Sequence, residues 1–318
     1  MYSVIIVDYN SIKITMKYVD TCLEKIVERS DLHFVVVDNM PQSRSEHILE
    51  TEMQLKFQKK VYNGMKVLCI EYKGTEVDVI LTQKNLGYAK GNNIGIDFSD
   101  KEWEDPYVVI SNNDIDFCRK ISLHNMCEVL ESNDRVAVVG PHIEDSNGNL
   151  QGPYQAGTAW ESLVARPVKV LAEFVFGKKE TQKKTVPTFY PNGEYYWVSG
   201  CFFVAAREKL RKAGNFDEST FLYGEEMILS ERLKRVGYTM YYLNDIRVIH
   251  RCSETIGRSL KDFEAEETLY KSLYYYYREY KDTNIFILTL SKISFPTVKF
   301  LFGLGKKINH IFKIRTMT

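Results

Sequence analysis

Short, unbroken runs of apolar residues, rich in β-branched side chains, recur along the first two thirds of the chain and constrain its fold most. They read SVIIV (3–7), HFVVVDN (33–39), YVVIS (107–111), VAVVG (136–140) and WVSGCFFVAA (197–206). A strand that is covered on both faces has this composition, because neither face meets water. The runs therefore predict a sheet that is buried on both sides.

Segments with helical periodicity separate these runs. After the first run, Asn10 or Ser11 can cap a helix whose apolar residues recur at three- and four-residue steps: Ile12, Met16, Val19, Leu23, Ile26 and Val27. Further helices are predicted near 121–132, from about 207, and around 225–236. The order strand, helix, strand indicates a right-handed parallel crossover. The predicted fold class is α/β, with a mixed, mostly parallel sheet flanked by helices.

Three segments depart from this alternation. Residues 42–84 predict a helix near 44–58 and then a hairpin around Lys73 and Gly74, which we interpret as an insertion. Residues 141–195 contain five of the eight prolines and the stretch KKETQKK, which is typical of a long, irregular surface loop. Residues 239–250, TMYYLNDIRVIH, alternate as paired strands do.

The composition excludes several classes of protein. Lys+Arg and Asp+Glu are 42 each, so no overall charge favours a nucleic-acid partner. The six cysteines form no CxxC pair, which indicates reduced thiols and neither a disulfide framework nor a zinc site. The first residues, MYSVIIVDYN, lack the basic segment and the long apolar run of a signal peptide, so we expect a cytoplasmic protein.

The C-terminal residues 283–318 are cationic. They contain no acid, and their basic residues are Lys292, Lys299, Lys306, Lys307, Lys313 and Arg315. Apolar residues are interleaved with these cations, but Lys292, Pro296 and Lys299 interrupt the run of about 20 apolar residues that a transmembrane helix needs. We expect a basic amphipathic helix that lies on an anionic bilayer, at the inner face of the plasma membrane. The alternative is a terminal helix packed on the domain.

Two aspartates, Asp114 and Asp116, follow the buried run YVVIS. In an open parallel sheet, ligands bind beyond the carboxyl ends of the strands. Two carboxylates so close repel each other unless a cation offsets their charge, and a hard divalent ion does so while leaving positions for phosphate oxygens. Acid-x-acid spacing also occurs elsewhere, for example at Glu50/Glu52 and Glu76/Asp78, so the spacing alone is weak and it is the position after a buried strand that favours a metal site here. A polar loop cap is the alternative.

Five segments together resemble the inverting family 2 glycosyltransferases, which have a GT-A fold. They are SVIIVDYNS, VVVDN, NLGYAKGNNIG, NNDID and residues 198–238, and with their order they cover residues 2 to about 260. The similarity is greatest to bacterial rhamnosyltransferase-like members that build cell-surface polysaccharide. The resemblance implies a GT-A domain over 1–260, with a nucleotide-sugar-binding half (1–140) and an acceptor and catalytic-base half (141–260). A helical, basic extension over 261–318 would follow.

The resemblance also implies residues that bind the donor, a UDP- or dTDP-sugar. Tyr9 and Asp38 would line the pocket for the nucleotide base, with Asp38 accepting a hydrogen bond from a ring nitrogen of uracil or thymine. Asn85, Gly87 and Lys90 would approach the diphosphate or ribose, where glycine permits close approach of the backbone. From the residues alone, Asp38 is equally a strand-end turn residue and Lys90 a solvated surface charge.

The metal ligands follow from the same resemblance. Asp114 would face the ribose or the metal, and Asp116 would hold the Mn²⁺ or Mg²⁺ that bridges the diphosphate. His250 ends an apolar run before a Ser-containing loop, HRCSETIGRS, and would approach the metal or the phosphates. A lone histidine is also often a structural residue.

The catalytic base is expected in GEEM, residues 224–227. The family usually has Glu-Asp here, and the position of the Asp falls on Glu226, with Glu225 in reserve. Both lie at a predicted helix N-terminus, so the alternative is that they only complement the helix dipole. Trp197, Ser199 and Gly200 would border the acceptor or donor sugar. The chain departs from the family at Asp8, where threonine is common, and at Ile228, where a second acid often follows.

The implied function is metal-dependent, inverting transfer of a sugar to a saccharide or lipid-linked saccharide, at the membrane surface. Such a reaction needs the departing diphosphate to be stabilised and the acceptor hydroxyl to be deprotonated. A sugar-nucleotide pyrophosphorylase would need a glycine-rich, basic loop after the first strand, and DYNSIK is not one. An inactive glycosyltransferase-like partner that binds nucleotide-sugar or glycan is the alternative function.

Overall fold

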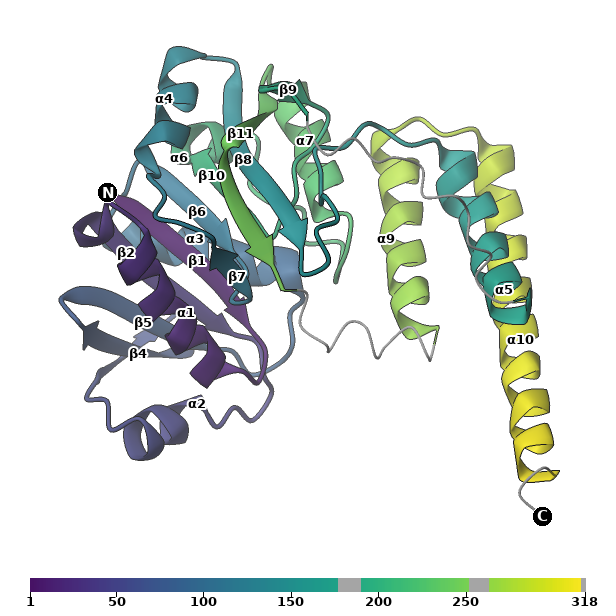
Figure 1. Cartoon of the computed structure of the whole chain (residues 1–318), viewed down its shortest axis with the longest axis horizontal. Helices are drawn as coiled ribbons and strands as arrows, with labels where there is room; N and C mark the ends of the chain where they lie inside the picture. Colours follow the sequence, from purple (N-terminus) through teal and green to yellow (C-terminus); the bar gives the residue numbers. More distant parts are fainter. Residues whose placement is uncertain (177–189, 252–262, 316–318) are drawn as a thin grey trace. The chain divides into compact units, whose positions relative to one another are not determined.

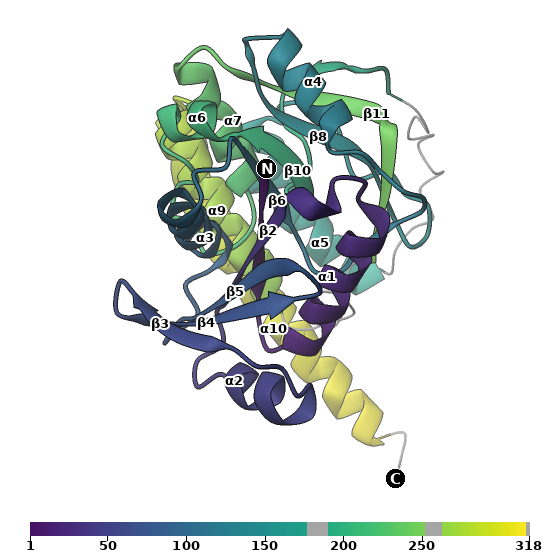
Figure 2. The same ribbon diagram turned by 90° about the vertical axis from the view of Figure 1, so that its left-hand side faces the viewer.

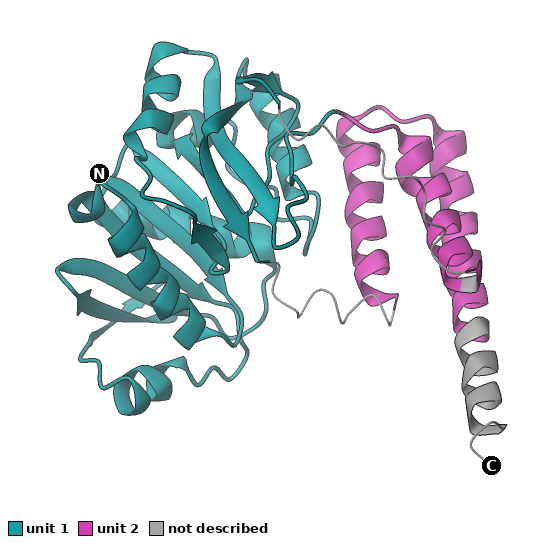
Figure 3. Cartoon of the chain, in the orientation of Figure 1, with its two compact units in different colours: residues 1–155, 189–255 teal, residues 156–188, 256–318 magenta. Residues whose placement is uncertain are grey.

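The computed structural model describes residues 1–176, 190–251 and 263–315. The chain divides into two compact units, which Figure 3 distinguishes by colour. The first comprises Met1–Gln155 and Phe189–Thr255, and the second comprises Ala156–Thr188 and Ile256–Thr318. Each unit is therefore made of two separate segments of the chain.

The first unit is built on one mixed sheet (Figure 1). The strands found in the described part of the chain are β1 (Tyr2–Asp8), β2 (Leu32–Asp38), β3 (Gln58–Tyr62), β4 (Met65–Tyr72), β5 (Thr75–Leu81), β6 (Tyr107–Ser111), β7 (Ile115–Phe117), β8 (Val136–Asp145), β9 (Gly193–Tyr195), β10 (Phe202–Ala206) and β11 (Thr239–His250). Their order is β3-β4-β5-β2-β1-β6-β10-β8-β11-β7, and β9 pairs with β11. The central strands β5, β2, β1 and β6 are parallel, whereas β10 is antiparallel to both its neighbours. The expected α/β class is confirmed.

Helices cover both faces of the sheet, which explains why its central strands are apolar throughout. On one face pack α1 (Ile12–Lys25) and α4 (His124–Ser132), and on the other face pack α3 (Tyr88–Glu102), α6 (Arg207–Lys212) and α7 (Glu225–Arg235). Alternate residues of β1 divide between the two layers: Val4 and Ile6 belong to the core under α1, and Ile5 belongs to the core under α3. Figure 2 shows α1 and α3 on opposite sides of the strands.

The hairpin expected before residue 82 is confirmed, but it is not an insertion. β4 and β5 are antiparallel and meet at Lys73 and Gly74, whose φ values of 54° and 82° suit a tight two-residue turn. β5 also pairs in parallel with β2, so it belongs to the central sheet. The helix expected near 44–58 is shorter. It consists of α2 (Ser45–His47) and the π-helical turn η2 (Ile48–Glu52), and β3 begins at Gln58. A short 3₁₀ turn, η1 (Arg29–Asp31), leads into β2.

Residues 239–250 form one strand, and the expectation of paired strands was wrong. Both halves of β11 pair in parallel with β8, with a register shift between Leu243 and Arg247, whose partners are the adjacent residues Pro141 and His142. Three residues of β11 therefore have no counterpart on β8, and the strand bulges there. The alternation of side chains is the same in both halves, so the sequence pattern could not show that the strand continues.

The second unit is helical. The π-helical turn η3 (Glu161–Ala165) leads directly into α5 (Arg166–Phe176), and α9 (Glu264–Tyr280) and α10 (Ile285–Arg315) come from the C-terminal segment. The irregular loop expected over 141–195 is wrong in part, because β8 extends to Asp145 and 161–176 are helical. Residues 156–188 also group with the C-terminal helices, which differs from the expected boundary after residue 260. The stretch KKETQKK lies outside the described residues.

Part of α10 has the length and composition of a membrane span. Among the described residues, this holds for Ile285–Leu304, with a hydropathy of 1.5. The sequence-based exclusion of such a helix was therefore wrong on these two criteria, because the helix continues through Pro296 and two lysines do not remove its apolar character. Length and composition are the extent of this finding, since the core helix of a soluble protein passes the same test.

Candidate active site

The predicted site residues come mainly from one edge of the sheet, where the parallel strands β1, β2, β5 and β6 end. Asp8 ends β1 and is in register with Asp38 at the end of β2, which is in register with Leu81 at the end of β5. Ser111 ends β6, and the acid pair follows it. This is the edge at which open parallel sheets bind ligands.

Asp38 is fully buried, and both its oxygens accept hydrogen bonds from its own loop. Oδ1 accepts from the amide of Met40 at 3.0 Å, and Oδ2 accepts from the hydroxyl of Ser43. The carboxylate thus shapes the turn after β2, which was the alternative to the base-binding role. Tyr9, one residue past β1, is exposed.

A cavity of about 660 Å³ lies beside this turn. Ser43 lines it together with Thr82 and Gln83, which follow β5, and with Lys59, Lys66 and Gly64 of the β3–β4 hairpin. Sequence analysis did not single out these residues. The hairpin places them there because Lys66 is in register with Leu81, so the β3–β4 turn reaches the ligand-binding edge.

The loop before α3 holds its predicted residues in different ways. Asn85 accepts from the amide of Gly87 at 3.1 Å, and Lys90 pairs with Glu218 at 3.1 Å. Gly87 has a φ of 81°, and a Cβ there would stand 2.3 Å from the carbonyl oxygen of Phe221. Glycine is therefore required for packing against the Phe221 backbone. The close approach to a phosphate that the sequence suggested is not needed to explain it.

The two aspartates each have a cationic partner. The Nε2 atom of His250 lies 3.2 Å from Oδ1 of Asp114, and Nδ1 lies 2.8 Å from Oε1 of Gln151. Burial lowers the pKa of His250, but its interactions with the Asp114 carboxylate and with Cys201 together outweigh this effect and raise the pKa to about 11. Asp116 pairs with the guanidinium of Arg251 at 2.5 Å, and the Arg251 amide donates to the carbonyl of Asp114 at 3.0 Å.

Asp8, which stands where the resembled family commonly has threonine, is hydrogen-bonded to the loop that carries these aspartates. It is fully buried, and its carboxylate accepts from the Ser11 amide at 3.1 Å and from the hydroxyls of Ser11 at 2.6 Å and Thr15 at 2.5 Å. The side-chain amide of Asn113 also donates to it, at 3.3 Å. Burial raises the pKa of Asp8, and the hydroxyl and amide donors counteract this rise. Asp8 thus ties the start of α1 to the residue before Asp114.

Glu225 and Glu226 open α7 as expected. Gly224 precedes them with a φ of 83°, which turns the chain sharply into the helix. Glu226 is half-buried and accepts from the amide of Gly200 at 3.1 Å. Glu225 is buried, and within the described residues no donor reaches its Oε1. Burial raises the pKa of both carboxyls, and the charge of Glu226 raises that of Glu225 further.

Tyr88, the first residue of α3, connects the acid pair with the glutamates. Its hydroxyl lies 2.9 Å from the carbonyl oxygen of Gly200 and 3.0 Å from Oδ1 of Asn112, and can donate to either. The side-chain nitrogen of Asn112 lies 3.4 Å from Nε2 of His250. A continuous series of contacts therefore runs from Glu226 through Gly200, Tyr88 and Asn112 to the His250–Asp114 pair. Tyr88 lies in the segment NLGYAKGNNIG, but the sequence predicted no role for this residue.

Trp197 and Gly200 lie on the approach to β10. The Trp197 ring stacks on Tyr154, with centroids 3.9 Å apart, so packing accounts for it. Gly200 has no room for a side chain, because a Cβ would stand 2.2 Å from Oε1 of Glu226. Ile228, the second departure from the family, is fully buried in α7.

The side chains of Asp114, Asp116 and His250 are chemically suited to bind a hard divalent cation. Carboxylate oxygens of Asp114 and Asp116 are ligands that Mn²⁺ and Mg²⁺ accept, and an imidazole suits Mn²⁺. No group of three His, Cys, Asp or Glu side chains with metal-binding geometry occurs among the described residues. The described residues could therefore supply only part of a coordination shell, and oxygens of a bound ligand would have to complete it. His250 would have to lose its proton to act as a ligand.

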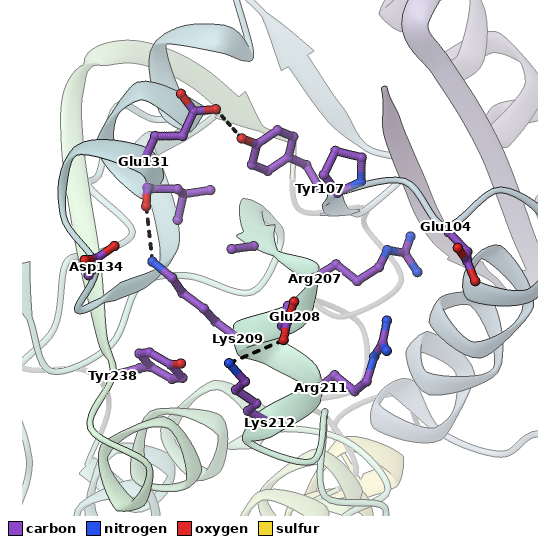
Figure 4. A pocket seen from close by; sticks show the side chains of 13 residues that line it. Glu104, Tyr107, Glu131, Asp134, Arg207, Glu208, Lys209, Arg211, Lys212 and Tyr238 are labelled. Atoms are coloured by element: carbon purple, nitrogen blue, oxygen red, sulfur yellow. Dashed lines mark hydrogen bonds and ion pairs between the residues drawn. The ribbon is translucent and has the colours of Figure 1, made fainter.

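Another cavity, of about 740 Å³, lies at the opposite edge of the sheet, where β6 begins and β10 ends (Figure 4). Several of its charged side chains contact one another, a tyrosine hydroxyl or the backbone. Glu131 accepts from the hydroxyl of Tyr107, Lys212 pairs with Glu208 at 3.3 Å, and Lys209 donates to the carbonyl of Val136 at 2.7 Å. These contacts stabilise the surroundings of α6, and the predicted site residues lie elsewhere.

Comparison with known proteins gives a consistent result. Residues 3–212 match the family described as Glycosyl transferase family 2. A curated relative, N-acetylglucosaminyl-diphospho-decaprenol L-rhamnosyltransferase of Mycobacterium tuberculosis, is 27% identical over 194 residues, which cover 57% of this chain and 61% of that protein. The chain thus spans less than two thirds of the length of this relative.

Two solved structures share the fold. One is GalNAc-T7 with UDP, GalNAc and Mn²⁺, with a TM-score of 0.53, 15% identity, and coverage of 79% of this chain and 44% of that chain. The other is the mannosyltransferase PcManGT of Pyrobaculum calidifontis with GDP-Man and Mn²⁺, with a TM-score of 0.52, 13% identity, and coverage of 96% and 73%.

Proposed function

Because the chain belongs to glycosyl transferase family 2, we propose that it moves a sugar, with inversion, from a nucleotide-diphosphate donor to a saccharide or lipid-linked saccharide acceptor. The GT-A fold supports this proposal, and so does the mycobacterial relative, whose name specifies a diphospho-decaprenol acceptor. The donor is a UDP- or dTDP-sugar, and the product belongs to cell-surface polysaccharide. With a lipid-linked acceptor, the reaction would take place at a membrane surface, which we propose to be the cytoplasmic face.

The observation that carries the proposal is the series of contacts that joins Glu226 to the His250–Asp114 pair on one edge of the sheet. Inverting transfer needs a base on one side of the sugar and stabilisation of the leaving diphosphate on the other. Glu226 is the base, which removes the proton of the acceptor hydroxyl. Its raised pKa brings a carboxylate closer to the basicity that this proton transfer requires.

Residues at the ends of the strands bind the nucleotide-sugar donor. Thr82 and Gln83 border the cavity for the nucleotide, and Asp114, Asp116 and His250 are the residues that would hold the metal. When bound, Mn²⁺ or Mg²⁺ neutralises charge on the departing diphosphate. The complexes of the two similar structures with Mn²⁺ and a nucleotide or nucleotide-sugar support this choice of cofactor.

A Glu226→Gln variant tests the base. We expect donor binding, measured by calorimetry with a UDP- or dTDP-sugar and Mn²⁺, to stay within about threefold of the original, because Gln keeps the shape of the side chain. Transfer should fall by about 10³-fold or more, because an amide cannot accept the proton. Glu208→Gln, on the exposed surface of α6, is the matched control and should change neither quantity. Near-normal transfer by Glu226→Gln would overturn the assignment.

The alternative, an inactive partner that binds nucleotide-sugar or glycan, rested on the departures at Asp8 and Ile228. Ile228 is buried in the core and Asp8 accepts hydrogen bonds from Ser11 and Thr15, and neither departure deletes the proposed base or the proposed metal ligands. A panel of donors with Mn²⁺ or Mg²⁺ and a membrane extract separates the two functions. Release of a nucleoside diphosphate supports the enzyme, and release from no donor supports the partner.

A further inference from the structure

α10 has two apolar faces. Its buried face consists of residues spaced at three and four positions: Leu288, Ser291, Phe295, Val298 and Phe302. This spacing keeps one side of a helix turned toward its neighbours. Phe263, Tyr270 and Phe174 pack against this face, with the Tyr270 and Phe295 rings stacked 3.9 Å apart. These contacts complete the core of the second unit.

The opposite face is apolar as well, yet exposed. Phe286, Ile293 and Phe300 recur every seven residues and are 68%, 63% and 70% exposed, and Leu304 continues the row. We call these four residues the α10 stripe. Residues on the same side of the helix between them, Thr289 and Thr297, are uncharged and exposed. Since α10 rises about 1.5 Å per residue, the stripe is about 27 Å long. A soluble protein rarely leaves a row of this length to water.

The two units carry opposite charge, although the whole chain is neutral. The second unit, 156–188 and 256–318, contains 17 Lys and Arg against 9 Asp and Glu, a net charge of +8. The totals are 42 of each, so the first unit contains 25 against 33, a net charge of −8. The exposed stripe therefore belongs to the cationic unit. Near an anionic lipid surface, each Lys or Arg contributes about 1 kcal/mol of attraction.

We propose that the second unit docks on an anionic lipid bilayer, with the α10 stripe inserted at the interface. A second copy of the chain is a poorer occupant, because it would bring together two units that each carry +8. The inference deepens the proposed function and rests on it for its purpose, since a lipid-linked acceptor lies in the membrane.

The packing of α10 favours a helix that lies in the interface over one that crosses the bilayer. Toward α9, the exposed Lys299 pairs with Glu267 at 2.5 Å, and the exposed Lys292 lies 5.2 Å from the Tyr274 ring of the same helix. α9 also carries Glu264, Lys271 and Arg278. A spanning α10 would have to leave this packing or draw these charges into hydrocarbon, which is costly. The stripe, in contrast, can enter lipid while the unit stays folded.

Vesicle binding by the whole chain tests the docking. We expect co-flotation with vesicles of phosphatidylcholine and phosphatidylglycerol, little with phosphatidylcholine alone, and a loss of binding as salt is raised. Ile293→Ser with Phe300→Ser should weaken binding to the anionic vesicles at least tenfold. The matched control is Ile14→Ser with Val61→Ser, which removes two exposed apolar residues from the first unit and should leave binding unchanged.

Circular dichroism with thermal melting should show that both double variants are folded. Equal vesicle binding by the original chain and the Ile293→Ser, Phe300→Ser variant would overturn the proposal. So would a chain that ignores anionic vesicles but forms a dimer by light scattering that this variant abolishes, since the stripe would then be covered by a second copy. Binding is measured without donor or acceptor. A chain that binds vesicles and transfers no sugar would refute the proposed function alone.

Discussion

At the scale of single residues, the site depends on one buried hydroxyl. Tyr88 lies between Asn112, which neighbours the proposed metal ligand His250, and Gly200, whose amide donates to Glu226. Burial raises the pKa of Tyr88 well above its usual range, so the hydroxyl keeps its proton and remains a donor. A single side chain thereby connects the proposed base with the proposed metal ligands, which come from distant parts of the sequence.

Tyr88→Phe removes this donor and nothing else. We expect transfer (kcat) to fall about 10- to 100-fold with little change in the KM for donor, because Gly200 and Glu226 lose their alignment. Tyr18→Phe is a matched control. The Tyr18 hydroxyl is also buried, and it lies 2.5 Å from the hydroxyl of Ser111, which ends β6 directly before Asn112. It lacks a contact with Gly200, so the loss of one buried hydrogen bond should lower stability by about 1 kcal/mol and leave kcat unchanged. Equal effects on kcat would show that Tyr88 has no special positioning role.

The buried Glu225 makes stability depend on pH. Its pKa is raised in the folded chain, so between the ordinary glutamate value and the raised value the unfolded chain holds fewer protons. Stability therefore falls as pH rises across this window. Glu225→Gln removes this dependence and should be more stable than the original chain at pH 8, by about 1.4 kcal/mol or more.

The advantage of Glu225→Gln should disappear at pH 5, where the original glutamate is largely protonated. Chemical denaturation at the two pH values measures the difference, and Glu208→Gln is an exposed control on α6. The same free energy of unfolding for Glu225→Gln and the original chain at both pH values would contradict the raised pKa.

At the scale of elements, Asp8 joins β1, α1 and the loop after β6. Asp8→Ala would leave the Ser11 and Thr15 hydroxyls and the Asn113 amide without this acceptor. We expect a loss of about 2–4 kcal/mol of stability, measured by urea unfolding, and weaker binding of Mn²⁺ with a nucleoside diphosphate, because Asn113 precedes Asp114. Asp8→Asn keeps one acceptor oxygen and should lose less. An Asp8→Ala chain with unchanged stability would exclude this role.

Elements were predictable from sequence where the pattern is local. The apolar runs predicted the central strands, and Lys73-Gly74 predicted the β4–β5 hairpin. Burial on both faces and a two-residue turn can each be recognised from residues that are neighbours in the sequence. The bulge in β11 and the pairing of β5 with β2 were missed, because register depends on a partner strand far away. The same reason hid the bond of Tyr88 to Gly200, 112 residues later. The acid pair was predicted from its position after a buried strand and GEEM from the resemblance, whereas Gln151 and Arg251, which contact His250 and Asp116, were not predicted.

At the scale of the whole molecule, the second unit needs both of its segments. Apolar residues of η3 and α5, such as Leu163, Val164 and Phe174, are covered by helices that begin some 100 residues later. A chain cut after Thr255 should therefore expose them, aggregate in light scattering and bind the dye ANS. A chain that also replaces 156–188 by a short Gly/Ser linker should stay monomeric. If the first truncation is monomeric and binds no dye, η3 and α5 do not depend on α9 and α10.

The position of β10 in the sheet dictates the order in which a nascent chain can assemble. β10 lies between β6 and β8 although it is made after both, from residues 202–206. On the ribosome, β1, β2, β5 and β6 can pair as soon as they emerge, but β8 must wait for β10 and β11 to reach either of its edges. During that interval the helices η3 and α5 are also complete and uncovered, so the middle of translation is when this protein most needs a chaperone.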